Sequence, residues 1–89
     1  MNIFYLDRDP KIAAQMHCDK HVCKMILESV QMLQVAQGIK EGYKNHPCTK
    51  WVKESHENYM WLYKLLANLC LEYTYRYGRL HKYFYKLFQ

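Results

Sequence analysis

Glycine and proline are scarce in this chain, with three and two copies among 89 residues. Sheet proteins rich in tight turns need both residue types, so their scarcity argues against such a fold and favours long helices. The sequence also has no run of about 20 apolar residues, which argues against a membrane-spanning helix. Its N-terminal stretch carries Asp7 and no sustained apolar run, so we predict no secretory signal and expect a cytoplasmic protein.

The four cysteines form no CxxC pair, which is the spacing typical of many zinc and redox sites. Without a secretory signal, their thiols are expected to stay reduced. His17 and His21 would share a helix face and could bind one metal ion together, but the same helix would turn Cys18 and Cys23 away from them. We therefore predict no metal site and no cofactor.

Hydrophobic and aromatic residues are abundant, at 51% and 16% of the chain. This composition is typical of a folded protein and excludes a disordered one. A chain of 89 residues suffices for one domain with a modest core, so we expect a single helical domain spanning residues 1–89. Such a small fold is marginally stable, and association into a homo-oligomer would strengthen it.

Signals for a helix start appear at Asp9 and Pro10, because Asp caps free N–H groups and Pro suits the first helical turn. Apolar residues then recur at helical spacing as far as Leu33, and Asp19 falls on the same stripe. Either the helix breaks near Cys18 and restarts with Asp19 as its cap, or Asp19 is buried beside a partner. We favour the break.

A second long helix is predicted to begin near Pro47 or Thr49 and to end at Gly78, which is well placed as a C-cap. Apolar side chains form one long face along this helix, down to Tyr73. Residues 79–88 put apolar and basic side chains on different faces and predict a third, short helix. The expected fold is therefore all-α, with two long helices packed antiparallel and a short C-terminal helix.

A row of chemically active side chains is expected on the first helix, at spacings of four, three and four residues: His17, His21, Lys24 and Glu28. Helical geometry places them on one stripe, roughly opposite the apolar positions, so we expect them to be reachable from solvent. Since histidine titrates near neutral pH, the row suits acid–base chemistry or anion binding. The alternative is a solvated face carrying ion pairs.

The segment NHPCTKW leads into the second helix. Free backbone N–H groups at a helix start can bind an anion, so Asn45 and His46 are candidate ligand contacts. The alternative is an ordinary helix entry, in which Asn45 or Thr49 caps the helix and Trp51 anchors the core. Trp51 and Trp61 fit a core role better than a base-stacking platform.

The end of the chain concentrates positive charge and tyrosine. The formal net charge is +5, and no acid follows Glu72. Local positive charge attracts phosphates, and tyrosine stacks on bases, so we predict that Tyr75 and Tyr77 are exposed ligand contacts. The predicted phosphate-binding residues are His17, Lys20, Lys24, Arg76, Arg79 and Lys82.

Three segments together resemble the pyrimidine dimer DNA glycosylase family, small all-helical repair proteins of phages and bacteria. They are AAQMHCDKHVCKMILE, NHPCTKW and YTYRYGR. The resemblance implies that the last of them binds DNA. It also implies that the N-terminal amine attacks the sugar to form an imine, assisted by a first-helix Glu. In this sequence Met1 would supply the amine, and His21 stands where that Glu is expected.

The leading hypothesis is a nucleic-acid-binding phage protein of glycosylase-like fold, with altered or lost catalysis. One alternative is a non-enzymatic oligomer that sequesters a small nucleotide in a pocket between subunits. Another is a protein-interaction module whose last helix docks on an acidic partner. A concave site of about 300–1,000 Å³ would favour a small ligand, whereas an open basic groove would favour DNA.

Overall fold

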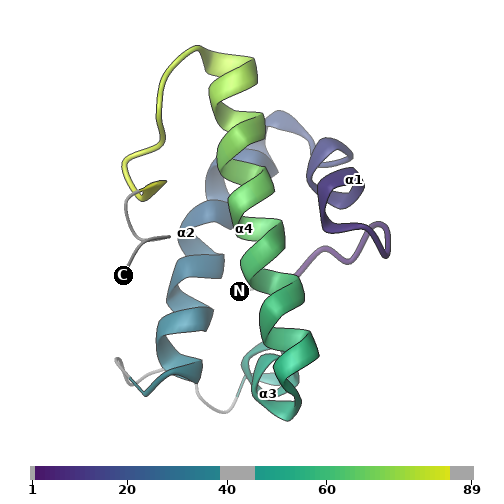
Figure 1. The fold of residues 1–89 in the computed structure, drawn as a ribbon. Helices are drawn as coiled ribbons and strands as arrows, with labels where there is room; N and C mark the ends of the chain where they lie inside the picture. The colour runs from purple at the N-terminus through teal and green to yellow at the C-terminus, as the bar shows by residue number, and fades with distance from the viewer. Residues whose placement is uncertain (1, 39–45, 85–89) are drawn as a thin grey trace.

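The computed structural model describes residues 2–38 and 46–84, and these form four helices with no strand (Figure 1). The helices are α1 (Pro10–Gln15), α2 (Asp19–Ala36), α3 (Pro47–Glu54) and α4 (His56–Tyr77). The two long helices, α2 and α4, run antiparallel. Their opposite ends are joined by an ion pair from Arg76 to Asp19 and by a hydrogen bond from Gln37 to Tyr59. The predicted all-α class is confirmed.

The first predicted helix is divided in two. Asp9 caps α1 as expected, since its Oδ1 accepts a hydrogen bond from the Lys11 N–H at 2.9 Å, and Pro10 is the first helical residue. The break falls near Cys18, as predicted. However, Cys18 itself is the N-cap of α2 and makes no side-chain capping bond. Asp19 is the first residue of the helix, where its negative charge interacts favourably with the positive end of the helix dipole.

The second predicted helix also breaks. It begins at Pro47 as expected, but it ends at Glu54, and a new helix begins at His56. Between them Ser55 has an extended backbone, with φ −154° and ψ 156°, and its Oγ accepts a hydrogen bond from the Asn58 N–H at 3.0 Å. A serine that caps a helix competes with helix continuation, which explains the break that apolar spacing alone does not reveal.

Gly78 ends α4 with a left-handed backbone, φ 70°, and its N–H donates to the Thr74 carbonyl oxygen at 2.8 Å. The predicted cap is confirmed. The chain then folds back along the bundle (Figure 1). Residues 79–83 are not helical, so the short helix does not begin at Arg79 as we expected, and Phe84 has a 3₁₀ conformation. The Tyr83 N–H donates to the His81 Nδ1, and the Phe84 N–H donates to the His81 carbonyl oxygen. These bonds take the place of α-helical ones in this segment. The rest of the expected helix lies outside the described residues.

The core lies mainly between α2 and α4, and α1 and α3 cover its two ends. Its largest fully buried side chains are Ile26, Met32, Leu62, Leu65 and Leu69. Cys70 packs among them as a small hydrophobe, and burial raises the pKa of its thiol to about 11. All four cysteines are unpaired thiols. Within the described ranges, none of the helices has the length and apolar content needed to cross a membrane.

Candidate functional site

His17 lies in the short turn between α1 and α2, and it is only 3% exposed. Its Nδ1 is 2.6 Å from the carbonyl oxygen of Ala13. Because a carbonyl can only accept, we assign the proton to Nδ1, which leaves Nε2 with a lone pair. That Nε2 atom is buried and has no hydrogen-bond partner in the part of the chain that the structure describes.

The surroundings of His17 keep its ring neutral. Burial lowers the pKa of His17 below its ordinary value of 6.5, against the opposing effect of the bond to Ala13. The nearby His21 and Arg76 lower this pKa further. The expected exposure of His17 was therefore wrong, because the turn between the helices directs the ring inward. A buried neutral imidazole with a free lone pair is suited to accept a proton or a hydrogen bond.

Phe4 connects the two histidines. Its ring stacks on His21, with centroids 4.5 Å apart and planes 12° apart. It also meets His17 edge-on, with centroids 5.7 Å apart. These contacts hold the N-terminal segment, residues 2–7, against the start of α2. Met1 lies outside the described residues.

Arg76, in the last turn of α4, joins the ends of three helices. Its Nε donates to Glu72 at 2.8 Å, its Nη1 to Asp19 at 2.9 Å, and its Nη2 to the Gln15 carbonyl oxygen at 3.1 Å. The contacts to Gln15 and Asp19 bracket the turn that carries His17. With three partners and a side chain only 19% exposed, Arg76 is placed to support this turn.

Tyr75 and Tyr77 lie on different sides of α4, so the structure does not bring these two predicted contacts together. Tyr75 is 85% exposed and borders a hollow that Lys11 also lines. Tyr77 packs beside α2, where a hydrogen bond with the Cys23 thiol is the largest effect raising its pKa. The Tyr77 ring also lies 4.8 Å from that of Tyr73, which is buried.

The segment after Gly78 remains attached to the bundle through His81. Its ring meets Tyr73 edge-on at 4.9 Å. Burial lowers the pKa of His81, opposed by a hydrogen bond to the Cys23 backbone. Arg79 donates to the Tyr73 hydroxyl at 3.3 Å, and the Lys82 ammonium lies 5.3 Å from the Tyr83 ring centroid.

The predicted phosphate-binding residues fall into two groups. Four of them are exposed: Lys20, Lys24, Arg79 and Lys82. The other two, His17 and Arg76, are held by the contacts described above. His46 lies apart from all of these, at the end of the bundle formed by α3, where its Nδ1 accepts a hydrogen bond from the Cys48 N–H and caps α3 (Figure 1). Asn45 lies outside the described residues.

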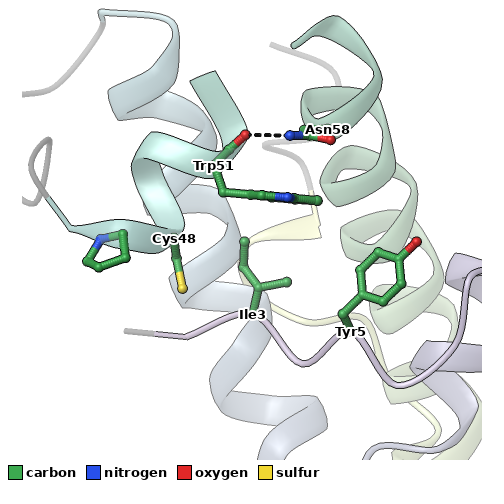
Figure 2. A pocket seen from close by; sticks show the side chains of 6 residues that line it. Ile3, Tyr5, Cys48, Trp51 and Asn58 are labelled. Atoms are coloured by element: carbon green, nitrogen blue, oxygen red, sulfur yellow. Dashed lines mark hydrogen bonds between the residues drawn. The ribbon is translucent and has the colours of Figure 1, made fainter. Parts of the chain in front are cut away.

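Sequence reasoning missed a pocket at the α3 end of the molecule (Figure 2). Its volume is about 570 Å³, and its lining residues are Ile3, Tyr5, Pro47, Cys48, Trp51 and Asn58. It also missed the role of Phe4. Both depend on the path of the N-terminal segment, which has no helical periodicity and forms no strand. The available signal was that NIFYL suits a short extended segment, in which successive side chains point to opposite sides.

The described residues contain no group of three or more His, Cys, Asp or Glu side chains placed to hold a metal ion. The site thus consists of two imidazoles, the N-terminal segment and a margin of exposed basic side chains.

The described residues thus form a small all-helical bundle with two histidines near one end. The model of the pyrimidine dimer DNA glycosylase family matches residues 1–86, and the chain belongs to this family. The resemblance that we inferred from three segments is thereby confirmed over nearly the whole chain. No curated protein and no solved structure matches the chain.

Proposed function

We propose that this protein binds DNA at the end of the bundle where α2 begins and α4 ends. One observation carries the proposal: Phe4 lies against both His17 and His21, so the N-terminal segment and the two imidazoles form one site. Membership of the glycosylase family supports DNA as the ligand. In this proposal His21 faces the sugar, the buried His17 supports it from behind Phe4, and exposed basic side chains hold the phosphates.

The basic side chains come from two segments, the start of α2 and the segment after Gly78, and the second segment contacts α2 at Cys23. Lys20 and Lys24 are exposed and one helical turn apart on α2, so they lie on the same side of it. Arg79 and Lys82 are exposed on the segment that returns along the bundle, beside the contacts of Tyr77 and His81 with Cys23. Arg76 in this proposal supports the site and does not contact phosphate.

Fluorescence anisotropy with labelled duplex DNA across a salt series tests the proposal. Each phosphate contact contributes about −0.9 to the slope of log affinity against log salt concentration. Replacing Lys20 and Lys24 together by Ala should make this slope less steep by about 2. A matched pair at the other end of the bundle, Lys50 and Lys53, is exposed on α3 and should leave the slope unchanged when both become Ala.

The outcomes of this experiment are distinct. Absence of binding at low salt would overturn the proposal. Equal losses from the two double variants would show that only net charge matters and would remove the assignment to this surface. Stronger binding to ultraviolet-irradiated duplex than to undamaged duplex would add damage recognition to the proposed function.

A second candidate function is cleavage at abasic sites, and it is favoured by the placement of His17 and His21 around Phe4 in the N-terminal segment. The Met1 amine would attack the aldehyde carbon of the open sugar, and water would leave as the imine forms. His21, as general base, would then take a proton from the neighbouring sugar carbon, and the 3′-phosphate would leave.

Borohydride reduction tests this second candidate, because it converts an imine into a stable covalent link between protein and DNA. We expect a link with abasic duplex and none after acetylation of the N-terminal amine. His21→Phe preserves a ring that can stack on Phe4 but removes the base, so it should trap DNA while cleaving it slowly. His56→Phe, at an exposed histidine, is the control. A link that survives acetylation would exclude the amine as nucleophile.

A further inference from the structure

The pocket at the α3 end lies between three parts of the chain. Ile3 and Tyr5 come from the N-terminal segment, Pro47, Cys48 and Trp51 from α3, and Asn58 from α4. Figure 2 shows the Trp51 indole extending across the space between Cys48 and the Tyr5 ring, with Ile3 below it. The volume of about 570 Å³ lies within the range of small-molecule sites. One chain forms it without a second copy.

The aromatic rings of this pocket are fixed from outside it. Tyr5 stacks on Trp61, with centroids 4.3 Å and planes 20° apart, and Trp61 in turn donates its indole N–H to the Arg8 carbonyl oxygen at 2.8 Å. Trp51 meets both rings edge-on, at 6.3 Å from Tyr5 and 6.1 Å from Trp61. The rings are therefore placed before any ligand arrives, which reduces the entropic cost of binding.

The chemistry of the lining selects a class of ligand. None of the six described lining residues has a charged side chain, so these side chains offer no ion-pair partner for a phosphate. Aromatic faces bind flat rings by stacking. The Asn58 amide nitrogen already donates to the Trp51 carbonyl oxygen at 2.8 Å, which leaves its carbonyl oxygen to accept from the edge of a ligand. A flat ring with polar N–H edges matches all three properties.

We propose that this pocket binds a nucleobase, either of a free nucleoside or of an unpaired residue in DNA. The site is separate from the histidines, because Ile3 and Tyr5 line the pocket whereas Phe4 between them contacts His17 and His21. In this proposal the pocket recognises the nucleobase by stacking on its ring and not by attraction to a charged group. The proposal therefore stands or falls independently of phosphate binding near Lys20 and Lys24.

Proton–nitrogen NMR of the whole protein tests the proposal. The chain has two tryptophans, so the spectrum contains two indole signals, and Trp51→Phe assigns them. Titration with adenosine and with thymidine should shift the Trp51 signal in a saturable manner. Their affinities should change less than about twofold between low and moderate salt, because no phosphate contact is involved. Cyclohexanol, an aliphatic ring, should give no saturable shift.

Two variants keep the result interpretable. Tyr5→Leu removes an exposed ring without opening the core and should weaken nucleoside binding about tenfold, as expected for one lost stacking contact. Leu71→Ala, at a 63% exposed leucine in the second half of α4, should leave the affinity unchanged. Melting temperatures of both variants establish that the fold is intact.

A final titration with single-stranded oligonucleotides distinguishes the two sources of the nucleobase, a free nucleoside and an unpaired residue in DNA. A shift of the Trp51 signal that Tyr5→Leu abolishes supports a base within DNA, and shifts with nucleosides alone support a free nucleoside. The proposal is overturned if neither nucleosides nor oligonucleotides shift the signal at millimolar concentration. It is also overturned if cyclohexanol binds as tightly as adenosine, or if Tyr5→Leu binds adenosine as tightly as the unmodified protein.

Discussion

Arg76 at the end of α4 and Asp19 at the start of α2 are 57 positions apart in the chain, yet 2.9 Å separates their Nη1 and Oδ1 atoms. The same guanidinium also binds Glu72 and the Gln15 carbonyl oxygen. The turn that carries His17 is thus held at both of its ends by one side chain. One side chain therefore contacts both long helices and the turn of the proposed DNA site.

Arg76→Met should lower the free energy of unfolding by about 1–3 kcal/mol, because it leaves a 15% exposed Glu72 carboxylate without its cation. Asp19→Asn should lower it by less than about 1 kcal/mol, since this carboxylate is 78% exposed. Urea denaturation measures both values. The exposed Glu54→Gln on α3 is the control and should stay near zero. Equal losses from Arg76→Met and Asp19→Asn would contradict this ranking.

Stability should fall as the pH falls below about 6.5. The pKa of His17 is lower in the folded protein than its ordinary value of 6.5, and the same holds for His81. Below 6.5 the unfolded chain therefore binds more protons, so acid favours unfolding. The contribution of each histidine is complete above pH 6.5 and is lost towards its lowered folded pKa, with a slope of at most about 1.4 kcal/mol per pH unit.

Urea denaturation from pH 8 to pH 5 measures this dependence. His17→Gln removes one of the two groups and should flatten the curve, even if it lowers stability at every pH. His56→Gln, at an exposed histidine, should leave the shape of the curve unchanged. A curve of His17→Gln parallel to that of the unmodified protein would show that His17 does not titrate differently on folding.

Gly78→Ala should destabilise the protein by about 1 kcal/mol, because an L-residue with a side chain rarely adopts φ 70°. A Cβ atom at this position would meet no heavy atom within 4 Å, so the cost is conformational and not steric. The melting temperature should fall by about 4–8 °C. Gly78→Asn should cost less, since Asn tolerates the left-handed region better. A larger loss for Asn than for Ala would contradict this explanation.

Two leucines on α4 should lose very different amounts of stability when they are truncated. Leu62 is fully buried, and Leu62→Ala should cost about 2–5 kcal/mol through lost burial and an internal cavity. Leu71 is 63% exposed on the same helix, and Leu71→Ala should change stability by less than about 0.5 kcal/mol. Both substitutions have the same effect on helix propensity, so denaturation curves compare burial alone.

The sequence predicted the helices better than their interruptions. Asp9, Pro47 and Gly78 act locally through caps and backbone geometry, so their positions could be read directly. The break at Ser55 could not, because the apolar spacing continues through it and a serine fits a helix face as well as a cap. Asp19 was expected either to cap a helix or to be buried, yet its partner Arg76 comes from the far end of the chain.

The candidate site was predictable as a set of residue types but not as an arrangement. The histidines and Lys24 were identified from helical spacing, and Lys20 was identified as a basic residue of the same segment. The burial of His17 was missed because it lies before the helix, where that spacing does not apply. The contrast between Tyr75 and Tyr77 follows from their separation by two positions on a helix, which places them on different sides. The pocket depends on tertiary packing of the N-terminal segment, for which no local rule exists.

The N-terminal segment lies with one edge in the pocket and the other on the histidines, since Ile3 and Tyr5 alternate with Phe4. Three consecutive residues therefore belong to two sites at once. A ligand that displaces this segment on one side must change its contacts on the other. If a pocket ligand changes the affinity for DNA at the histidines by some factor, then DNA changes the affinity for the pocket ligand by the same factor, because binding free energies are reciprocal. Any coupling between the two proposed sites would therefore pass through the N-terminal segment.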